Sequence, residues 1–198
     1  MDLFQLFKKP TAPTQQTQQP SQPVSDDLRK AAIGQTCSNL AMYCRDANLP
    51  DALMHKYTSG MIIRERGFVD TTALSGGVVT NHRYIILSNH MMPLFQLEGD
   101  KQWALCVANK DSRFLVLGKA AGKGKRVTVL LHLHDASWRL FQSIDMRLFK
   151  TLTDNCFQTF AKCIQQPPIA SVSTAEWLDR CKFPIGMDDN GVFFPVED

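Results

Sequence analysis

Two histidines, His132 and His134, form the pattern in this chain that is best suited to metal chemistry. Alternation along the predicted strand 127–134 puts both imidazoles on one face, and imidazole nitrogens are common zinc ligands. A zinc site would need a third ligand, which His82 or His90 could supply from another strand. The same spacing fits two histidines that form hydrogen bonds on a polar sheet face. We favour this second interpretation and expect neither a metal nor another cofactor.

Residues 118–126 read Gly-Lys-Ala-Ala-Gly-Lys-Gly-Lys-Arg, a segment rich in glycine and lysine. A P-loop would need one more residue before its Gly-Lys pair, a Ser or Thr after the lysine, and a following helix, whereas a strand is predicted here. We therefore favour a solubilising turn at the tip of a hairpin. The alternative is a tip that binds nucleic-acid phosphates. Its basic side chains would be Lys119, Lys123, Lys125 and Arg126.

Nucleophilic and acid–base catalysis find little support in the sequence. No Gly-x-Ser-x-Gly elbow is present, and no cysteine lies in a recognisable activating context. The carboxylates of the predicted strand region fall mostly at turns, namely Glu98, Asp100, Asp111 and Asp135. The sequence thus leaves open whether the chain is an enzyme and leans against it.

The six cysteines form no pattern of the zinc-ribbon or redox type, since no C-x-x-C pair occurs. Cys37 and Cys44 are seven residues apart, as are Cys156 and Cys163, and both pairs fall within helical patterns. Seven residues along a helix rise roughly 10 Å, too far for a disulfide. We expect small buried hydrophobic side chains, with pairing between helices or a reactive thiol as alternatives.

The first 25 residues differ in composition from the rest. Residues 1–9 combine four apolar with two basic side chains, and fourteen of the sixteen residues 10–25 are Pro, Thr, Gln or Ser. Such a segment has too little apolar area to offset its ordering entropy, so we predict a disordered tether. A peptide at its end can dock into an apolar groove of a partner; a passive leader and a weak membrane anchor are the alternatives. The docking side chains would be Leu3, Phe4, Leu6, Phe7, Lys8 and Lys9.

The uncharged leader rich in Gln, Ser, Thr and Pro resembles the N-terminal export segment of some bacterial secreted effectors. This resemblance implies export without a cleaved secretory signal. We favour a cytoplasmic location over this alternative, because Asp2 comes first and the basic pair follows the apolar residues, the reverse of a secretory signal. No apolar run approaches the roughly 20 residues of a transmembrane segment.

The elements that must position these residues begin with helices. Ser25 is a suitable N-cap, and apolar spacings of three and four predict a helix over 26–47, followed by a short one from Pro50 to Tyr57. A helix of nearly thirty residues is predicted from Ser137 to the prolines at 167–168. A last short helix starts at Ser173-Thr174, and Asn190-Gly191 predicts a final hairpin.

The middle of the chain predicts strands joined by short polar links, the pattern of an antiparallel meander. The predicted strands are 78–79, 84–87, 94–97, 103–107, 114–117 and 127–133. We therefore expect an α+β fold. In it, an antiparallel sheet of about four to six strands packs on the long helix, with the N-terminal helix beside it and a disordered N-terminal tail.

Composition fits one globular domain over residues 26–198, since the 198-residue chain is 44% hydrophobic with a net charge of +3. We predict a non-enzymatic cytoplasmic adaptor or accessory protein. It would bind a protein partner through both the peptide 1–9 and the folded domain, so that effective concentration strengthens a weak contact. The alternatives are a nucleic-acid-associated protein that uses the 118–126 tip and an exported bacterial effector. One version of that effector is an enzyme that uses His132 and His134. The sequence leaves partner identity and oligomeric state open.

Overall fold

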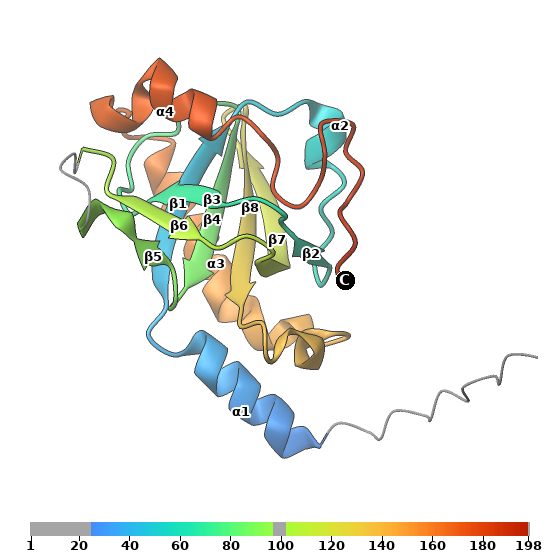
Figure 1. Ribbon diagram of the computed structural model, residues 1–198. Coiled ribbons are helices and arrows are strands. Elements are labelled where there is room, and N and C mark those ends of the chain that lie inside the picture. Colours follow the sequence, from blue (N-terminus) through green and yellow to red (C-terminus); the bar gives the residue numbers. More distant parts are fainter. Residues whose placement is uncertain (1–24, 97–101, 198) are drawn as a thin grey trace, which may run out of the picture.

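The computed structural model describes residues 25–96 and 102–197 of the chain. At its centre is an eight-stranded sheet in the order β2-β7-β8-β4-β1-β3-β6-β5 (Figure 1). The β4–β8 pair is parallel and every other neighbouring pair is antiparallel. The strands are β1 (Ala41–Ala47), β2 (Ile62–Arg64), β3 (Val69–Thr72), β4 (His82–Ser88), β5 (Met92–Pro93), β6 (Leu105–Ala108), β7 (Arg113–Gly122) and β8 (Lys125–Leu133).

The described helices are short. The α-helices are α1 (Asp26–Cys37), α2 (Asp51–Met54), α3 (Lys150–Cys163) and α4 (Ala175–Arg180), and the 3-10 helices are η1 (Leu94–Gln96), η2 (Trp138–Phe141), η3 (Met146–Phe149) and η4 (Ala170–Ser173). The expected antiparallel meander of four to six strands on one long helix is therefore wrong: the sheet is mixed and has eight strands.

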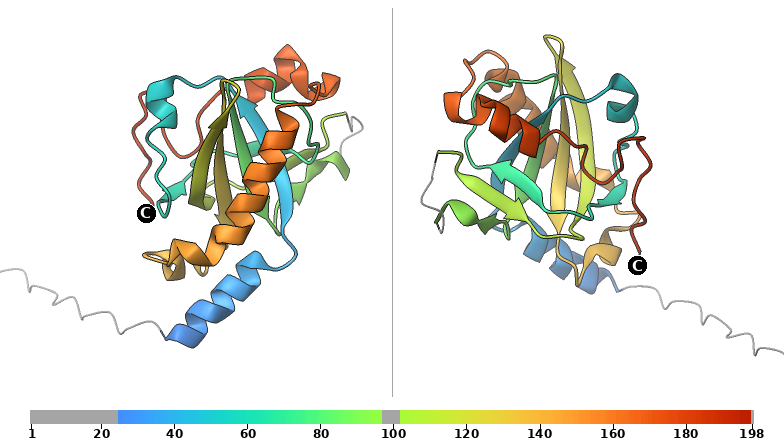
Figure 2. Two further views of the ribbon diagram at one scale, coloured as in Figure 1. Left: turned by 180° about the vertical axis from the view of Figure 1, so that it is seen from behind. Right: turned by 45° about the horizontal axis from the view of Figure 1, so that its top comes forward.

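One face of the central strands packs against α3, which crosses the back of the sheet (Figure 2, left). Apolar residues alternate along β8, so that Val127, Val129 and Leu131 face this layer. They meet Cys156 and Phe160 of α3. This alternation confirms the prediction for strand 127–133.

The opposite face of the sheet is covered by α2 and by the chain after α4. Tyr84 and Leu130 on this face pack with Leu53 of α2 and with Ile185 and Met187. Because both faces are covered, all seven residues of β4 are buried. The candidate site described below lies on this second face.

The predicted helix from residue 137 onward is broken into pieces. Its C-terminal half is α3, but its N-terminal half consists of η2 and η3. Ser143 between them has a φ of +57°, and the Asp145 carboxylate accepts a hydrogen bond from the Arg147 backbone N–H at 3.0 Å. These local conformations interrupt a stretch whose apolar spacing is otherwise helical.

The predicted helix over 26–47 is half correct. Ser25 caps α1, because its hydroxyl accepts a hydrogen bond from the Leu28 backbone N–H at 3.3 Å. The helix ends at Cys37, Asn39 adopts a φ of +51°, and residues 41–47 form β1 instead. All seven residues of β1 pair with β4. Cys37 and Cys44 thus do not share a helix.

Several smaller predictions have mixed outcomes. The strand expected at 78–79 is absent from the described residues, and residues 94–96 form η1. The hairpin expected at 118–126 is present, but its strands are longer than predicted, because β7 and β8 continue to a two-residue turn at Lys123 and Gly124, both with positive φ. The last helix is confirmed as α4, capped by the Thr174 hydroxyl. At Asn190-Gly191 the structure has a single bridge, Met187 to Phe193, rather than two strands.

No helix within residues 25–96 and 102–197 is long and apolar enough to cross a membrane. All six cysteines are free, and five of them are buried, which agrees with small core side chains. The predicted docking peptide and tether, residues 1–24, lie outside the described residues.

Candidate binding cleft

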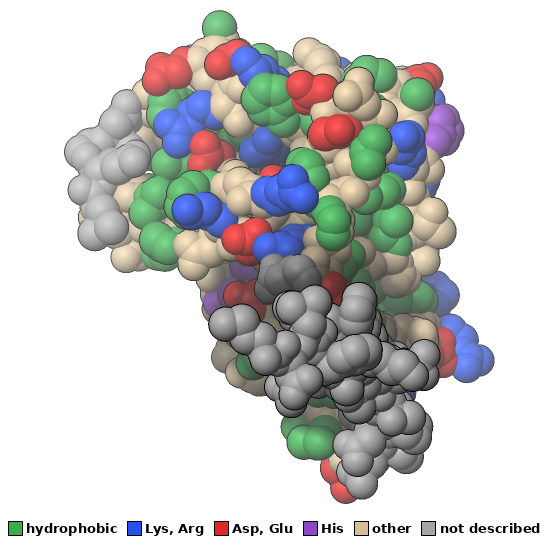
Figure 3. All heavy atoms as spheres, turned by 45° about the vertical axis from the view of Figure 1, so that its right-hand side comes forward, with side chains coloured by type: hydrophobic (Ala, Val, Ile, Leu, Met, Phe, Trp, Pro, Cys, Tyr) green, Lys and Arg blue, Asp and Glu red, His purple; other side chains and the backbone are tan. Residues whose placement is uncertain are grey.

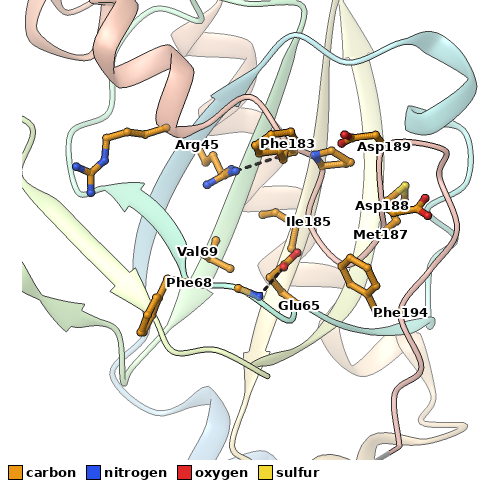
Figure 4. A pocket seen from close by; sticks show the side chains of 13 residues that line it. Arg45, Glu65, Phe68, Val69, Phe183, Ile185, Met187, Asp188, Asp189 and Phe194 are labelled. Atoms are coloured by element: carbon orange, nitrogen blue, oxygen red, sulfur yellow. Dashed lines mark hydrogen bonds between the residues drawn. The ribbon is translucent and has the colours of Figure 1, made fainter.

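A cleft of about 390 Å³ opens on the second face of the sheet. Its walls come from β1, from the β2–β3 connection, from the end of α4 and from residues 183–194 (Figure 4). Segments far apart in sequence therefore meet here. The side chains that carry the argument below are Arg45, Glu65, Phe68, Arg180 and Phe183.

Arg45 lies at the base of the cleft and is only 6% exposed. Its Nη1 donates to the Asp70 carbonyl oxygen and its Nη2 to the Phe183 carbonyl oxygen, each at 3.1 Å. Its Nε has no hydrogen-bond partner among the described residues, and no described carboxylate forms an ion pair with it. A buried guanidinium held only by carbonyl oxygens retains a strong attraction for an anion.

A second guanidinium lines the cleft. Arg180 donates from Nε to the Asp70 carboxylate at 3.0 Å, and its side chain is 38% exposed. Its planar group also lies 5.5 Å from the ring centroid of Trp103. Arg180 is thus oriented by α4 and β3, and the Asp70 carboxylate compensates its charge.

Two aromatic rings lining the same cleft are unusually exposed. Phe68 is 59% and Phe183 50% exposed, although rings of this size are normally buried. Figure 4 shows Phe68 and Phe183 coming from opposite walls of the cleft. Exposed rings beside a cation favour a ligand with a flat ring and a negative charge.

Glu65 is a fixed carboxylate of the cleft wall. Its Oε1 accepts a hydrogen bond from the Gly67 backbone N–H at 2.8 Å, and its Oε2 accepts one from the Gly186 backbone N–H at 2.7 Å. Gly186 has a φ of +82°, which favours glycine, and an added Cβ would lie 2.9 Å from the Ile63 side chain. Glu65 thereby joins the β2–β3 connection to the C-terminal segment.

Two buried tyrosines hold the C-terminal wall in place. The Tyr57 hydroxyl donates to the Ile185 carbonyl at 2.7 Å, and the Tyr84 hydroxyl accepts from the Ile185 backbone N–H at 3.3 Å. The two hydroxyls are 2.7 Å apart, so Tyr84 donates to Tyr57. Burial raises the pKa of Tyr84 to about 12, which keeps this hydroxyl neutral.

The predicted histidine pair is brought together with a third histidine, but not around a metal. The His90 ring stacks between His132, at 3.9 Å between centroids, and His134, at 4.0 Å. His132 hydrogen-bonds to the Ser88 and Ser112 hydroxyls. Stacked rings point their nitrogens in parallel rather than toward one centre. The described residues contain no group of three or more His, Cys, Asp or Glu suited to a metal ion.

Each basic side chain of the 118–126 segment contacts an oxygen of the protein itself. Lys119 donates to the His55 carbonyl at 3.0 Å and Lys125 to the Thr80 carbonyl at 2.7 Å. Lys123 contacts the Gln165 side chain, and Arg126 forms two hydrogen bonds to the Asp51 carboxylate. On the face shown in Figure 3, acidic and basic side chains are intermixed. Phosphate binding by these residues stays a prediction, as does docking by Leu3, Phe4, Leu6, Phe7, Lys8 and Lys9.

Sequence reasoning missed the cleft. Arg45 falls within the predicted helix 26–47, where no pattern in the sequence singles it out. The available signal was Gly67-Phe68, a turn glycine followed by an aromatic residue in a segment that the pattern left undetermined.

No protein-family model matches the chain, and no curated protein sequence matches it. Solved structures are similar in part. The ADP-ribosyltransferase HopU1 of Pseudomonas syringae is 17% identical with a TM-score of 0.42, over 48% of this chain and 46% of that one. The type III effector XopAI of Xanthomonas axonopodis is 11% identical with a TM-score of 0.42, over 48% and 44%.

Exoenzyme S of Pseudomonas aeruginosa, solved with human 14-3-3 protein beta and carba-NAD, is 16% identical with a TM-score of 0.42. The match covers 62% of this chain and 62% of that one. The chain thus spans less than two thirds of each of these three structures. They include named transferases, so the comparisons contradict the prediction of a non-enzymatic adaptor, which we do not retain. Likeness at this level assigns no activity to the chain.

Proposed function

We propose that the chain is an enzyme that binds NAD in this cleft and transfers its ADP-ribosyl group. The observation that carries the proposal is Arg45, a buried guanidinium without a carboxylate partner at the base of the cleft. Its carbonyl partners orient it and leave its charge available. An anionic group of a ligand compensates that charge in a site of low dielectric.

The surroundings of Arg45 favour a dinucleotide over a simple anion. Arg180, paired with the Asp70 carboxylate, still has guanidinium N–H groups that a diphosphate can share, and Phe68 and Phe183 offer two exposed rings for two flat groups. Gly67 of the β2–β3 connection lines the same wall. A ligand with a diphosphate between two rings matches these features in kind. Carba-NAD is bound in one of the partly similar structures, which makes NAD the dinucleotide to test first.

Glu65 is the residue that we assign to the chemical step. Breaking the bond between nicotinamide and ribose leaves the bonding electrons on nicotinamide and positive charge on the sugar carbon. A fixed carboxylate stabilises that charge electrostatically. Water or a side chain of an acceptor protein then attacks the same carbon and loses a proton. Two backbone amides hold Glu65 in one position, so it needs no reorganisation during the step.

Binding of carba-NAD, measured by calorimetry, tests the cleft. We expect Arg45→Met to weaken binding about tenfold or more, because it removes a charge-assisted contact. The matched control is Arg147→Met. Arg147 is 90% exposed, pairs with Asp145 and does not line the cleft. Phe68→Ala and Phe183→Ala remove exposed rings without disturbing the core, so each separates ligand loss from misfolding. Equal binding by all variants, or none by the wild type, refutes the proposal.

Release of nicotinamide from NAD tests the chemistry. We expect the wild-type chain to release it and Glu65→Gln to reduce the rate about a hundredfold while carba-NAD still binds. A chain that binds carba-NAD but releases no nicotinamide, with or without acceptor proteins, would retain the binding site and refute the transfer.

We further propose that the chain is an exported effector, with residues 1–25 as its signal. The support is the uncharged composition of residues 10–25, which are rich in Gln, Ser, Thr and Pro. A translocation reporter fused to the full chain should leave a type III secretion-competent bacterium, and deletion of residues 2–24 should retain it in the cell. Equal export of both fusions contradicts the assignment.

A further inference from the structure

A second cavity, of about 260 Å³, lies on the same face of the sheet but away from the cleft. It is bounded by α2, by the start of β4 and by the β7–β8 hairpin, which lie side by side in Figures 1 and 2. Its polar side chains are His82, Thr128, Lys119 and Arg126. Apolar atoms of Met54 and of Ala120 and Ala121 complete the wall.

Two fully buried polar groups of this wall have no partner. His82 is 1% exposed, and neither its Nδ1 nor its Nε2 forms a hydrogen bond to any described residue. The Thr128 hydroxyl is 0% exposed and is likewise without a partner. Leaving such groups unpaired is unfavourable, because their hydration is lost on folding and no hydrogen bond replaces it. A histidine and a threonine lining one cavity in this state indicate a site built for a polar ligand.

Sheet register explains why these side chains share a wall. Tyr84 of β4 lies opposite Thr128 of β8, and Thr128 lies opposite Lys119 of β7, so their side chains leave the same face. His82 and Arg126 form the next row. The row through Tyr84 continues to Arg45 on β1. The buried Tyr84 therefore separates this cavity from the cleft.

The charge around the cavity is positive. Lys119 and Arg126 line it, and Asp51 pairs with Arg126, so these three side chains sum to +1. Lys119 gives one of its three N–H groups to the His55 carbonyl and keeps two for a ligand. Burial, and then these two cations, lower the pKa of His82 to about 3, so its ring is neutral. A neutral imidazole presents one donor and one acceptor nitrogen.

We propose that this cavity binds the head group of a small phosphate monoester in its singly protonated form. The phosphoryl oxygens accept hydrogen bonds from Lys119 and from Thr128. The remaining P–OH donates to the acceptor nitrogen of His82. A carboxylate or sulfonate has no proton to donate and leaves that nitrogen unpaired. The cavity also has room for a short apolar stem against Met54 and Ala120.

The test is NMR of the full chain labelled with ¹⁵N-histidine, titrated with propyl phosphate at pH 6, where the second phosphate proton is about half bound. His82→Gln identifies the His82 ring signals by their loss. We expect these ring nitrogens to shift with a millimolar dissociation constant or tighter, on the order of −4 kcal/mol. Butyrate and propanesulfonate should bind about fivefold more weakly or worse, because they donate no hydrogen bond.

Variants localise the binding. Lys119→Gln should weaken it about tenfold, and Thr128→Val about threefold or more, since a charged and a neutral hydrogen bond are lost. Lys123→Gln is the matched control, because it removes the same charge from the same hairpin outside the cavity. Arg45→Met should leave the shifts unchanged, which separates this site from the NAD cleft.

Three results would overturn the proposal. The first is that the His82 ring signals do not respond to propyl phosphate at about 20 mM. The second is that Lys119→Gln and Lys123→Gln weaken binding equally, which would indicate a surface charge effect. The third is that butyrate binds as tightly as propyl phosphate, which would indicate that no P–OH donor is recognised.

Discussion

Single residues fix the geometry of the cleft through hydrogen bonds to backbone. Tyr57 and Tyr84 engage both the carbonyl and the N–H of Ile185. Arg45 and Glu65 engage the neighbouring Phe183 and Gly186. Residues 183–186 do not form a strand. Hydrogen bonds from these side chains therefore satisfy the backbone groups that a neighbouring strand would otherwise pair with. The C-terminal wall is therefore positioned by side chains from four segments of the chain, namely β1, the residues after α2, the β2–β3 connection and β4.

We predict that Tyr57→Phe lowers the free energy of unfolding by about 1–3 kcal/mol, because it leaves the Ile185 carbonyl without a donor and the Tyr84 O–H without an acceptor. Urea denaturation measures this loss. Tyr43→Phe is the control, since Tyr43 forms no hydrogen bond to a described residue, and it should change stability by less than about 0.5 kcal/mol. Equal effects of the two variants would contradict the proposed role of the Tyr57 and Tyr84 hydroxyls in holding Ile185.

At the scale of elements, the end of β8 and the chain after β4 are joined by the histidine stack. Burial, and then the neighbouring histidines, lower the pKa of His132 to about 3 and that of His90 to about 4. Asp135 opposes this effect at His90. His132 and His90 therefore fold with neutral rings, whereas unfolded histidines titrate near 6.5.

We predict that the chain loses stability as the pH falls below about 6.5. Between pH 6.5 and the lowered pKa values of the folded state, the histidines of the unfolded chain bind protons, whereas His132 and His90 of the folded chain stay neutral. Stability is thus fully present above pH 6.5 and declines toward the folded-state pKa. For fully buried His132 the slope is at most about 1.4 kcal/mol per pH unit.

Urea denaturation between pH 7 and pH 5 measures this slope, above the range in which most carboxylates titrate. His132→Gln removes one of the titrating groups, so its stability should depend less steeply on pH than that of the wild type. A variant with an unchanged slope would show that other groups cause the dependence.

At the scale of the whole molecule, one junction ties the layers together. Arg83 of β4 forms a buried ion pair with Asp46 of β1 at 2.6 Å and donates to the carbonyls of Gly76 and Gly77. The Gly77 backbone N–H in turn donates to the Pro167 carbonyl, just after α3. The junction thus connects the sheet, the β3–β4 connection and the end of the α3 layer.

We predict that Gly77→Ala destabilises the fold by more than about 2 kcal/mol, because overpacking against fixed atoms costs this much. An added Cβ would lie 2.3 Å from the Gln166 carbonyl oxygen and 2.6 Å from the Pro167 carbonyl carbon. Gly34→Ala in α1 is the control, since nothing lies within 4 Å of its added Cβ. It should stabilise by about 0.5–1 kcal/mol. Thermal unfolding distinguishes the two, and a neutral Gly77→Ala would contradict this packing.

Local sequence determined those elements that depend on neighbours along the chain. The Ser25 and Thr174 caps, the alternation in β8 and the apolar spacing of α3 were all predicted, because each rests on contacts a few residues apart. Tertiary structure decided the rest. Residues 41–47 have a helical spacing but form β1 because β4 offers seven paired residues, and the parallel β4–β8 pair joins segments about forty residues apart. The cleft depends on that choice, because only as a strand does this segment bury Arg45 opposite Tyr84 and beneath Phe183.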